Sequence, residues 1–409
     1  MESLRLKKRF LLQAQLLNLD IRGGMVRRTS SRFCFGVEHG DYNNLELFGV
    51  GTDRFIWVAY KPNTSGRIRI FSENMPDEGL VDFSLADATM ANPLQSGWAR
   101  FPKGAVSILK REGYQIETGM DAIVYGNIPG GGMSRSASLS LNLIESLLEL
   151  NGYVEIPGMD IVNLAQMVEV DYIGSPCGKL DQVMIYFAKA GMGTYFNPVN
   201  EHVEHIEFGG DIDRYRVVCM DTGTKRAGLE ASTYKIRRQQ CDGMNAYLQA
   251  QLGRTLPEIF KQESDFRRAE CMLHSELPDC VPLVRYLYAA QSRIHSTIAA
   301  WKQGDFALVG ENFRADGLGL RDEYQISGPE LETMCDLART VPGVLGERML
   351  GGGDKGASGA LVEQAAVEPL KAAIDCAYPL AHPQFRDDYA VHVCSLVDGV
   401  SVCPLAEMP

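Results

Sequence analysis

Apolar and polar residues alternate between residues 45 and 70, a segment rich in aromatic and β-branched side chains. A period of two places successive side chains on opposite faces of a strand, so this segment predicts paired β-strands. Two shorter apolar runs have a similar character. Residues 215–220 (Tyr-Arg-Val-Val-Cys-Met) predict a buried strand, and residues 390–397 predict a closing strand near the end of the chain.

Other segments repeat their apolar residues at the three- to four-residue spacing of an amphipathic helix. The clearest is residues 138–150, which an Asn-Gly stop signal follows. The same spacing predicts a helix at residues 98–111 and another at residues 360–377. Residues 235–303 are rich in Arg, Glu, Gln, Leu and Ala, which indicates a largely helical stretch.

Predicted strands and helices are therefore mixed through both halves of the 409-residue chain. This mixture predicts the α+β fold class. A soluble chain of this length most often divides into two domains. We predict an amino-terminal domain over residues 1–210 and a carboxy-terminal domain over residues 211–409.

The composition excludes several classes of protein. Hydrophobic residues make up 45% of the chain and charged residues 22%, which is typical of a folded globular protein and not of a disordered one. The formal net charge is −12, so we expect no nucleic-acid partner. The ten cysteines form no C-x-x-C pair and no Cys/His cluster with zinc spacing, which indicates reduced thiols in a cytoplasmic protein.

The amino terminus resembles a signal peptide only superficially. Basic residues precede an apolar run, but Gln13 and Gln15 interrupt this run and no small-residue cleavage site follows. The spacing of its leucines predicts an amphipathic helix instead. No stretch reaches the roughly 18 apolar residues of a membrane span, so we expect a cytoplasmic protein with no membrane partner.

The first segment with a chemical signal is residues 129–138 (Pro-Gly-Gly-Gly-Met-Ser-Arg-Ser-Ala-Ser), directly before a predicted helix. Successive glycines let the backbone approach a ligand closely, and the unpaired N–H groups of a helix start attract anions. The hydroxyls of Ser134, Ser136 and Ser138 offer hydrogen bonds to phosphate or ligands to magnesium. The spacing differs from a P-loop, and ordinary capping of the helix is the alternative interpretation.

A second glycine-rich segment, residues 351–359, contains the dinucleotide-binding pattern Gly-x-Gly-x-x-Gly. Too few residues follow this segment for a doubly wound sheet, so a tight turn is the alternative interpretation. Two glycine-rich loops far apart in the sequence could together enclose a phosphate chain.

Two short polar segments offer side chains for binding and catalysis. Glu38, His39 and Asp41 lie within four residues and suit several hydroxyl groups of a sugar, although their segment is also ordinary turn sequence. Asp181 follows a glycine-containing turn at residues 176–179. An aspartate near a helix start is usually a cap, which is the alternative for this residue.

In this order, these segments resemble the galactokinase branch of the GHMP small-molecule kinases. The resemblance extends from about residue 30 to the carboxy terminus, with the segments in register. The matching segments are residues 37–43 (Val-Glu-His-Gly-Asp-Tyr-Asn) with Arg32 before them, 132–138 (Gly-Met-Ser-Arg-Ser-Ala-Ser), 177–182 (Cys-Gly-Lys-Leu-Asp-Gln), 232–241 (Ser-Thr-Tyr-Lys-Ile-Arg-Arg-Gln-Gln-Cys), and 320–327 with 348–353 (Leu-Arg-Asp-Glu-Tyr-Gln-Ile-Ser and Arg-Met-Leu-Gly-Gly-Gly).

The resemblance implies a two-domain fold with the active site in the cleft between the domains. It also implies ATP- and Mg²⁺-dependent phosphorylation of the anomeric (C1) hydroxyl of galactose or a related aldose. In this interpretation Asp181 takes the proton from that hydroxyl or activates it electrostatically, and Arg32 holds the carboxylate and offsets charge on the phosphoryl group. The expected partner is a small-molecule sugar, and the expected state is a monomer or homodimer.

The same resemblance assigns the other residues of the site. The residues implied for the sugar are Glu38, His39, Asp41, Gly178 and Tyr234. Those implied for the nucleotide are Trp98, Gly131, Gly132, Ser134, Arg135, Ser136, Ser138, Gly352 and Gly353. Trp98 would lie near the adenine, and a place in the core is the alternative for it. Ser136 and Asp181 are the residues expected to bind Mg²⁺.

The chain departs from the family pattern where the nucleotide is expected. Arg135 replaces a serine of the phosphate loop, and would either pair with phosphate oxygens or obstruct the magnesium position. Asp354 and Lys355 replace Phe-Gly, and a carboxylate near polyphosphate is unfavourable unless a cation offsets its charge. These departures motivate one alternative function, a catalytically lapsed relative that serves as a sugar or nucleotide sensor or regulatory protein and contacts another protein.

Overall fold

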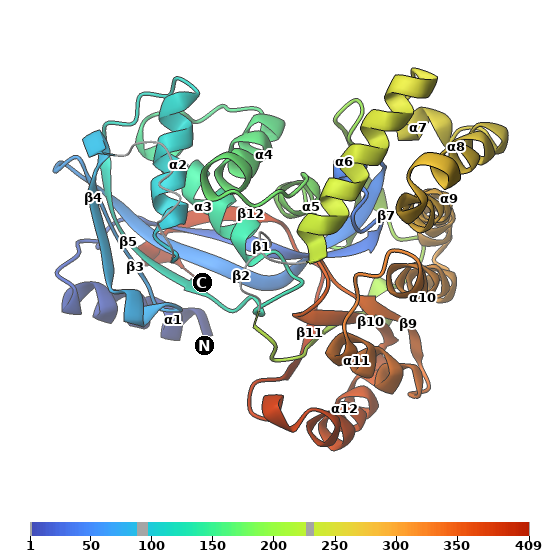
Figure 1. Cartoon of the computed structure of the whole chain (residues 1–409). Coiled ribbons are helices and arrows are strands. Elements are labelled where there is room, and N and C mark those ends of the chain that lie inside the picture. The colour runs from blue at the N-terminus through green and yellow to red at the C-terminus, as the bar shows by residue number, and fades with distance from the viewer. Residues whose placement is uncertain (1, 88–96, 226–232, 409) are drawn as a thin grey trace.

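The computed structural model describes residues 2–87, 97–225 and 233–408, and it contains two β-sheets with helices on their faces (Figure 1). The larger sheet is built mainly from the first half of the chain, and the smaller sheet from the second half. Strands and helices are mixed in both halves, which confirms the predicted α+β class.

The larger sheet has the strand order β12-β1-β2-β5-β3-β4, and β6 joins it through β2 and pairs with β7. Its neighbouring strands are antiparallel except for β3 and β5, which are parallel. The strands are β1 (Met25–Gly36), β2 (Leu47–Asn63), β3 (Arg67–Ser72), β4 (Leu80–Ser84), β5 (Gly119–Gly126), β6 (Met192–Asn197), β7 (His202–Glu207) and β12 (Val400–Pro404).

The expectation of paired strands at residues 45–70 holds only in part. Both strands form, as β2 and β3, but they do not pair with each other. β5 lies between them, with Ile56 of β2 opposite Gly126 and Ile68 of β3 opposite Met120. Local alternation predicts a strand, whereas the identity of its neighbour depends on segments that are distant in sequence.

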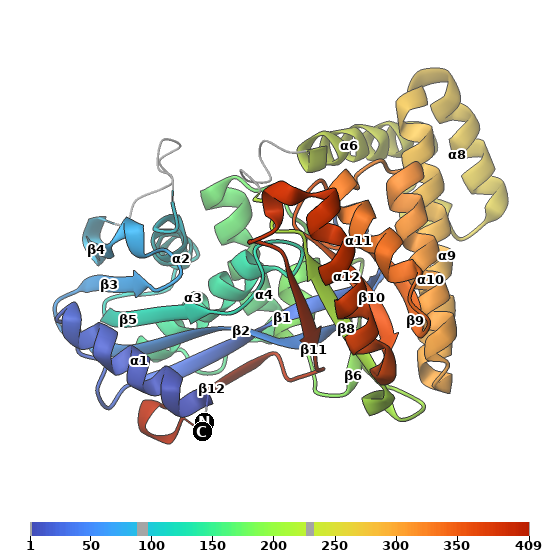
Figure 2. The ribbon, with the colours of Figure 1, turned by 90° about the horizontal axis from the view of Figure 1, so that it is seen from below.

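Helices cover both faces of the larger sheet (Figures 1 and 2). α1 (Glu2–Leu16) packs on one face, which confirms the predicted amino-terminal helix, and Phe10 joins Ile123 of β5 in its core. On the other face lie α2 (Arg100–Arg111), α3 (Arg135–Leu150), α4 (Gly158–Met167) and α5 (Leu180–Tyr186). α3 begins at Arg135 and not at the predicted Ser138, so part of the predicted loop is helical.

The smaller sheet has the order β11-β8-β10-β9. Its strands are β8 (Tyr215–Asp221), β9 (Val344–Met349), β10 (Ala357–Glu363) and β11 (Ala390–Cys394), with α11 (Pro329–Arg339) and α12 (Val367–Ala381) on one face. β8 and β11 confirm two predicted strands. The helix predicted at residues 360–377 is wrong at its start, because residues 357–363 form a strand that pairs with β8 and, over residues 358–362, with β9.

The predicted helical stretch at residues 235–303 is confirmed. It forms α6 (Thr233–Leu252), α7 (Leu256–Ile259), α8 (Glu263–Glu276) and α9 (Val281–Gln303), and α10 (Phe306–Asp322) follows. None of the helices within the described ranges is long and apolar enough to cross a membrane.

The chain then returns to the larger sheet, where Val400 of β12 lies opposite Thr29 of β1. The domain boundary at residue 210 stays a prediction.

Candidate active site

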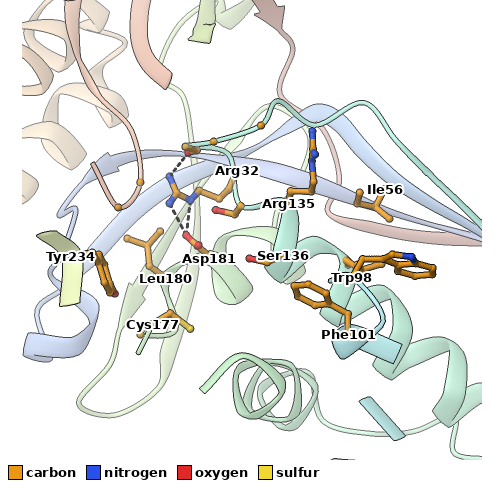
Figure 3. Close-up of a pocket in the computed structure, with 18 of the residues that line it drawn as sticks. Arg32, Ile56, Trp98, Phe101, Arg135, Ser136, Cys177, Leu180, Asp181 and Tyr234 are labelled. Carbon is orange, nitrogen blue, oxygen red and sulfur yellow. Dashed lines mark hydrogen bonds and ion pairs between the residues drawn. The ribbon is translucent and has the colours of Figure 1, made fainter. Parts of the chain in front are cut away.

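A cavity of about 380 Å³ lies where β1, α3 and α5 face the loop after β9. Its lining has a polar end, which includes Arg32 and Asp181, and an apolar end, which includes Trp98 and Phe101. Figure 3 shows these two groups on opposite sides, with Ser136 between them. One cavity therefore offers both hydrogen-bonding groups and an apolar wall.

Asp181 and Arg32 form an ion pair at the polar end. Asp181 lies in the first turn of α5, where the helix dipole favours a carboxylate, and Arg32 lies within β1. Arg32 Nη2 and Nε donate to Asp181 Oδ1 at 2.6 Å and 2.8 Å. Arg32 is buried, whereas 30% of the Asp181 side chain is exposed. Folding thus brings together two residues that are 149 positions apart, with Asp181 open to the cavity.

Arg32 also connects the ion pair to the rest of the polar end. Its Nη1 donates to Glu38 Oε1 at 3.2 Å and to the carbonyl oxygen of Gly132 at 3.3 Å. Burial alone would lower the pKa of Arg32, but Asp181 and Glu38 raise it above its ordinary value. The guanidinium therefore stays charged beside both carboxylates.

The five residues that the resemblance assigns to a sugar all line the cavity: Glu38, His39, Asp41, Gly178 and Tyr234. Asp41 accepts hydrogen bonds from the backbone N–H groups of Leu180 at 3.1 Å and Tyr42 at 3.0 Å. Burial raises the pKa of Asp41 to about 6. A side chain at Gly178 would place its Cβ 2.1 Å from Asp41 Oδ2, so this contact requires glycine.

The imidazole of His39 is held by aromatic side chains. Its ring centroid lies 5.3 Å from that of Tyr234 and 5.0 Å from that of Tyr324. His39 Nδ1 lies 2.9 Å from the hydroxyl of Tyr42, which in turn lies 2.7 Å from the hydroxyl of Tyr324. These contacts fix the plane of the ring at the cavity wall.

The first glycine loop presents Gly131 and Gly132 to the cavity directly before α3 begins. Ser134 and Ser136 also line the cavity. The buried hydroxyl of Ser134 has no hydrogen-bond partner among the residues that the structure describes. Unpaired hydroxyl and N–H groups at a helix start are suited to an anion.

Ser138, by contrast, does not line the cavity, although the sequence analysis assigned it to the nucleotide. It is buried, and its hydroxyl lies 2.8 Å from the hydroxyl of Thr29 on β1. The helical period turns Ser138 about 200° away from Ser136, so the two hydroxyls cannot share one face of α3. Its side chain therefore attaches α3 to the sheet.

The second glycine loop packs directly on the first. Gly351 and Gly352 line the cavity, but Gly353 does not. A Cβ at Gly131 would lie 2.6 Å from the Cα of Gly356, so the two backbones are in contact. No room for a phosphate group remains between these two glycines, and the cavity borders both loops on one side.

The residues that depart from the family pattern are engaged within the protein. Arg135 Nε donates to the carbonyl oxygen of Ile128 at 3.1 Å, and Nη2 donates to the same atom. Figure 3 shows the Arg135 guanidinium directed away from Asp181. Asp354 Oδ2 accepts a hydrogen bond at 2.8 Å from the N–H of Thr233, at the start of α6. Ser232, the first residue of the matching segment there, lies outside the described residues.

Trp98 satisfies both of its sequence interpretations. It lines the apolar end of the cavity together with Phe101 and Ile56. It is also only 5% exposed and belongs to the main hydrophobic core. The apolar wall is thus the part of the hydrophobic core that borders the cavity.

Sequence reasoning missed Glu169, in the π-helical turn Val168–Ile173. Its Oε2 accepts a hydrogen bond from Ser136 Oγ at 2.8 Å, and its Oε1 accepts one from Gln182 Nε2 at 2.9 Å. Burial, together with repulsion by Asp181, raises the pKa of Glu169 to about 7. No motif marks this residue, which lies 33 positions from Ser136 in sequence.

Ser136 and Asp181 line the cavity, and Glu169, which is buried and outside the lining, accepts a hydrogen bond from Ser136. Mg²⁺ prefers oxygen ligands, and a divalent cation would relieve the repulsion between the two carboxylates. Within the described ranges no group of three His, Cys, Asp or Glu side chains could hold a metal ion. A magnesium site here therefore has to combine carboxylates with the serine hydroxyl, and with oxygens of the nucleotide.

Comparisons with known sequences agree on one family. The family described as the GHMP kinases N terminal domain matches residues 100–189. A galactokinase from Exiguobacterium sibiricum is 32% identical over 352 residues, which covers 83% of this chain and 85% of that protein. A galactokinase from Enterococcus faecalis is 29% identical over 342 residues, which covers 83% of this chain and 86% of that protein.

Two solved structures are similar to this chain over most of its length. The structure of Lactococcus lactis galactokinase complexed with galactose has a TM-score of 0.87 at 26% identity, over 97% of this chain and 99% of that chain. The structure of Methanococcus jannaschii mevalonate kinase has a TM-score of 0.65 at 15% identity, over 92% of this chain and 99% of that chain. The second similarity shows a shared fold only.

Proposed function

Because the chain belongs to the galactokinase family of GHMP kinases, we propose that it transfers the terminal phosphoryl group of ATP to the anomeric hydroxyl of galactose. The observation that carries this proposal is the Arg32–Asp181 ion pair, with its carboxylate exposed to the cavity. A protein that only binds a sugar has no need of such a pair between a sugar pocket and a glycine loop.

In the proposed reaction, the C1 hydroxyl oxygen of the sugar forms a bond to the γ-phosphorus. The bond from the γ-phosphorus to the bridging oxygen breaks, ADP leaves, and Asp181 accepts the hydroxyl proton. Both hydrogen bonds from Arg32 go to Asp181 Oδ1, which leaves Oδ2 for the sugar. The Arg32 charge also offsets the negative charge that develops during transfer.

The sugar would be recognised through its other hydroxyl groups. Asp41 and Glu38 supply carboxylate acceptors, and the His39 ring, fixed by Tyr42, forms part of the cavity wall. A site built to hydrogen-bond particular hydroxyls rejects an analogue that lacks them, because buried polar groups are then left unpaired. This supports a preference among epimeric aldoses.

The nucleotide would lie along the glycine loops towards the apolar wall. Backbone N–H groups before α3 and the positive end of that helix favour the phosphates, while Trp98 and Phe101 offer contact for the base. Ser136, Glu169 and Asp181 would hold Mg²⁺, which when bound neutralises part of the phosphate charge.

The alternative of a catalytically lapsed sensor has no support in the geometry. It was motivated by Arg135 and Asp354, whose side chains bind the carbonyl oxygen of Ile128 and the N–H of Thr233. Arg135 lines the cavity, but its guanidinium is directed away from Asp181 (Figure 3). A cytoplasmic location and a monomeric or homodimeric state stay predictions.

The direct test is ADP release by the purified protein with a panel of aldoses. We expect galactose-dependent ADP formation, and we expect Asp181→Asn to lower kcat about 10²- to 10⁴-fold because the proton acceptor is lost. Calorimetry should show that Asp181→Asn still binds galactose. The matched control is Asp160→Asn, in the first turn of α4 and outside the cavity, which should keep wild-type kcat. Tight galactose binding without turnover on any aldose would support the sensor instead.

A further inference from the structure

A chain of alternating charges continues from the Arg32–Asp181 pair into the second half of the molecule. Arg32 Nη1 donates to Glu38 Oε1 at 3.2 Å. Arg348 Nη2 lies 3.5 Å from the same oxygen atom. Arg348 Nη1 in turn donates to Asp316 Oδ2 at 2.9 Å. Arg32 and Glu38 thus connect Asp181, the proposed proton acceptor, to two residues that do not line the cavity.

The inner members of this chain are buried. The side chains of Arg32, Glu38, Arg348 and Asp316 are at most 4% exposed. Their two positive and two negative charges balance, and buried charges are tolerated only when they are paired and hydrogen-bonded. Removal of one of these four side chains would therefore leave the neighbouring buried charges without one of their partners.

Glu38 contacts several residues from the second half of the molecule. Its Oε1 accepts a hydrogen bond from the N–H of Gly351 at 3.1 Å, in addition to its contacts with Arg32 and Arg348. Its carbonyl oxygen accepts one from the Tyr286 hydroxyl of α9 at 3.1 Å. No hydrogen bond to Oε2 is present in the part of the chain that the structure describes. Oε2 is thus the oxygen left for the cavity.

The position of Arg348 allows it to hold the Glu38 carboxylate in place. It lies on β9, the strand that leads directly into the loop of Gly351 and Gly352. Its Nη2 also donates to the carbonyl oxygen of Cys34 on β1 at 2.7 Å, so the guanidinium spans both sheets. Asp316, on α10, holds the opposite end of the guanidinium.

We propose that Arg348 and Asp316 are positioning residues for phosphoryl transfer. The pair holds Glu38 Oε1, so that Oε2 faces the sugar and Arg32 stays aligned on Asp181. Neither residue touches the cavity, so both act through Glu38. This inference rests on the proposed function and deepens it.

The structure provides a matched control on the same two elements. Glu347, the neighbour of Arg348 on β9, is fully buried and pairs with Arg314 of α10 at 2.7 Å. A second arginine, Arg339, pairs with Glu347 at 2.8 Å. This cluster also joins β9 to α10 through a buried carboxylate, although its two arginines are partly exposed, and it lines no part of the cavity.

The test compares full-length Arg348→Gln, Arg348→Lys, Asp316→Asn and Glu347→Gln with the wild type. Asp316→Asn is nearly isosteric, so this variant still tests the positioning role if Arg348→Gln does not fold. We expect kcat/KM for galactose to fall about 100-fold in Arg348→Gln and about tenfold in Asp316→Asn, because small displacements of reacting groups are costly. The KM for ATP should change less than about twofold, and Arg348→Lys should recover part of the loss.

Glu347→Gln should lower the Tm while it leaves both KM values and kcat as in the wild type. The positioning role is overturned if Asp316→Asn and Glu347→Gln have the same kinetic constants. Absence of galactose turnover by the wild type would instead count against the proposed function. Calorimetry of galactose binding decides the inference even in that case, since equal affinities in Asp316→Asn and the wild type overturn it.

Discussion

At the scale of single residues, Glu169 is a proposed Mg²⁺ ligand, and its carboxyl group has to be ionised to bind the metal. Burial and the nearby Asp181 raise its pKa to about 7 from an ordinary value of 4.5. The folded protein therefore binds a proton at Glu169 more tightly than the unfolded chain does. As a result, the free energy of unfolding falls as the pH rises through 4.5 towards 7. A magnesium ion needs the ionised form, so protons and Mg²⁺ compete for this site.

This competition predicts a pH-dependent requirement for magnesium. Between pH 8 and pH 6 we expect the affinity for Mg²⁺ to fall about tenfold, because Glu169 becomes largely protonated over that range. The measurement is the Mg²⁺ concentration for half-maximal activity at each pH. Glu169→Gln is the control, since it removes the carboxylate but leaves the protonation of the nucleotide unchanged. An equal pH dependence in both proteins would exclude Glu169 as the titrating group.

At the scale of elements, the two glycine loops act as one unit. The backbone of Gly131 lies against Gly356, and Asp354 attaches the second loop to the start of α6, which carries Tyr234. Because their backbones are in contact, movement of one loop would displace the other. The proposed nucleotide side and sugar side of the cavity are therefore mechanically connected.

Substitution of glycine in the first loop tests this contact. A Cβ at Gly131 would lie 2.6 Å from Gly356 Cα, whereas a Cβ at Gly130 would meet nothing closer than Asp221 Oδ2 at 4.0 Å. We expect Gly131→Ala to destabilise the protein by about 1–3 kcal/mol and to raise the KM for ATP, because the loops must separate. Gly130→Ala is the matched variant and should have the smaller effect in thermal unfolding and in ATP kinetics. Equal effects would show that loop contact is not the cause.

At the scale of the whole molecule, both ends of the chain support the sheet that carries Arg32. β12 pairs with β1 from Met25 to Thr29, and Leu405 is buried in the core beneath α1. The last strand of the chain therefore completes a sheet that the first strands begin. The order of elements along the chain does not follow their order in space.

Deletion of residues 400–409 tests how far the first half depends on this strand. We expect the Tm to fall by at least about 5 °C, since a strand and a buried leucine are lost from the core. Activity should fall as well, because β12 borders the strand that holds Arg32. Deletion of residues 407–409 alone keeps β12 and Leu405, and it should have little effect. A shorter chain with unchanged Tm and kcat would contradict the expectation.

The sequence alone determined the element types where periodicity is local, and it determined which residues meet at the polar end of the cavity. Arg32, Glu38, Asp41 and Asp181 were identified because the segments around them resemble motifs of the family, and all four line the cavity. Tertiary structure alone decided which strands pair, since β5 comes between β2 and β3 from a distant segment.

Tertiary structure also decided which way individual side chains point and which distant residues they contact. Ser138 faces Thr29 because the helical period turns it away from the cavity, and Arg135 binds the carbonyl oxygen of Ile128. Glu169 lies in no matching segment, and Arg348 begins one that assigned it no role; contacts between distant segments bring them to Ser136 and Glu38. A sequence pattern reports neighbours along the chain, whereas ion pairs and packing depend on neighbours in space.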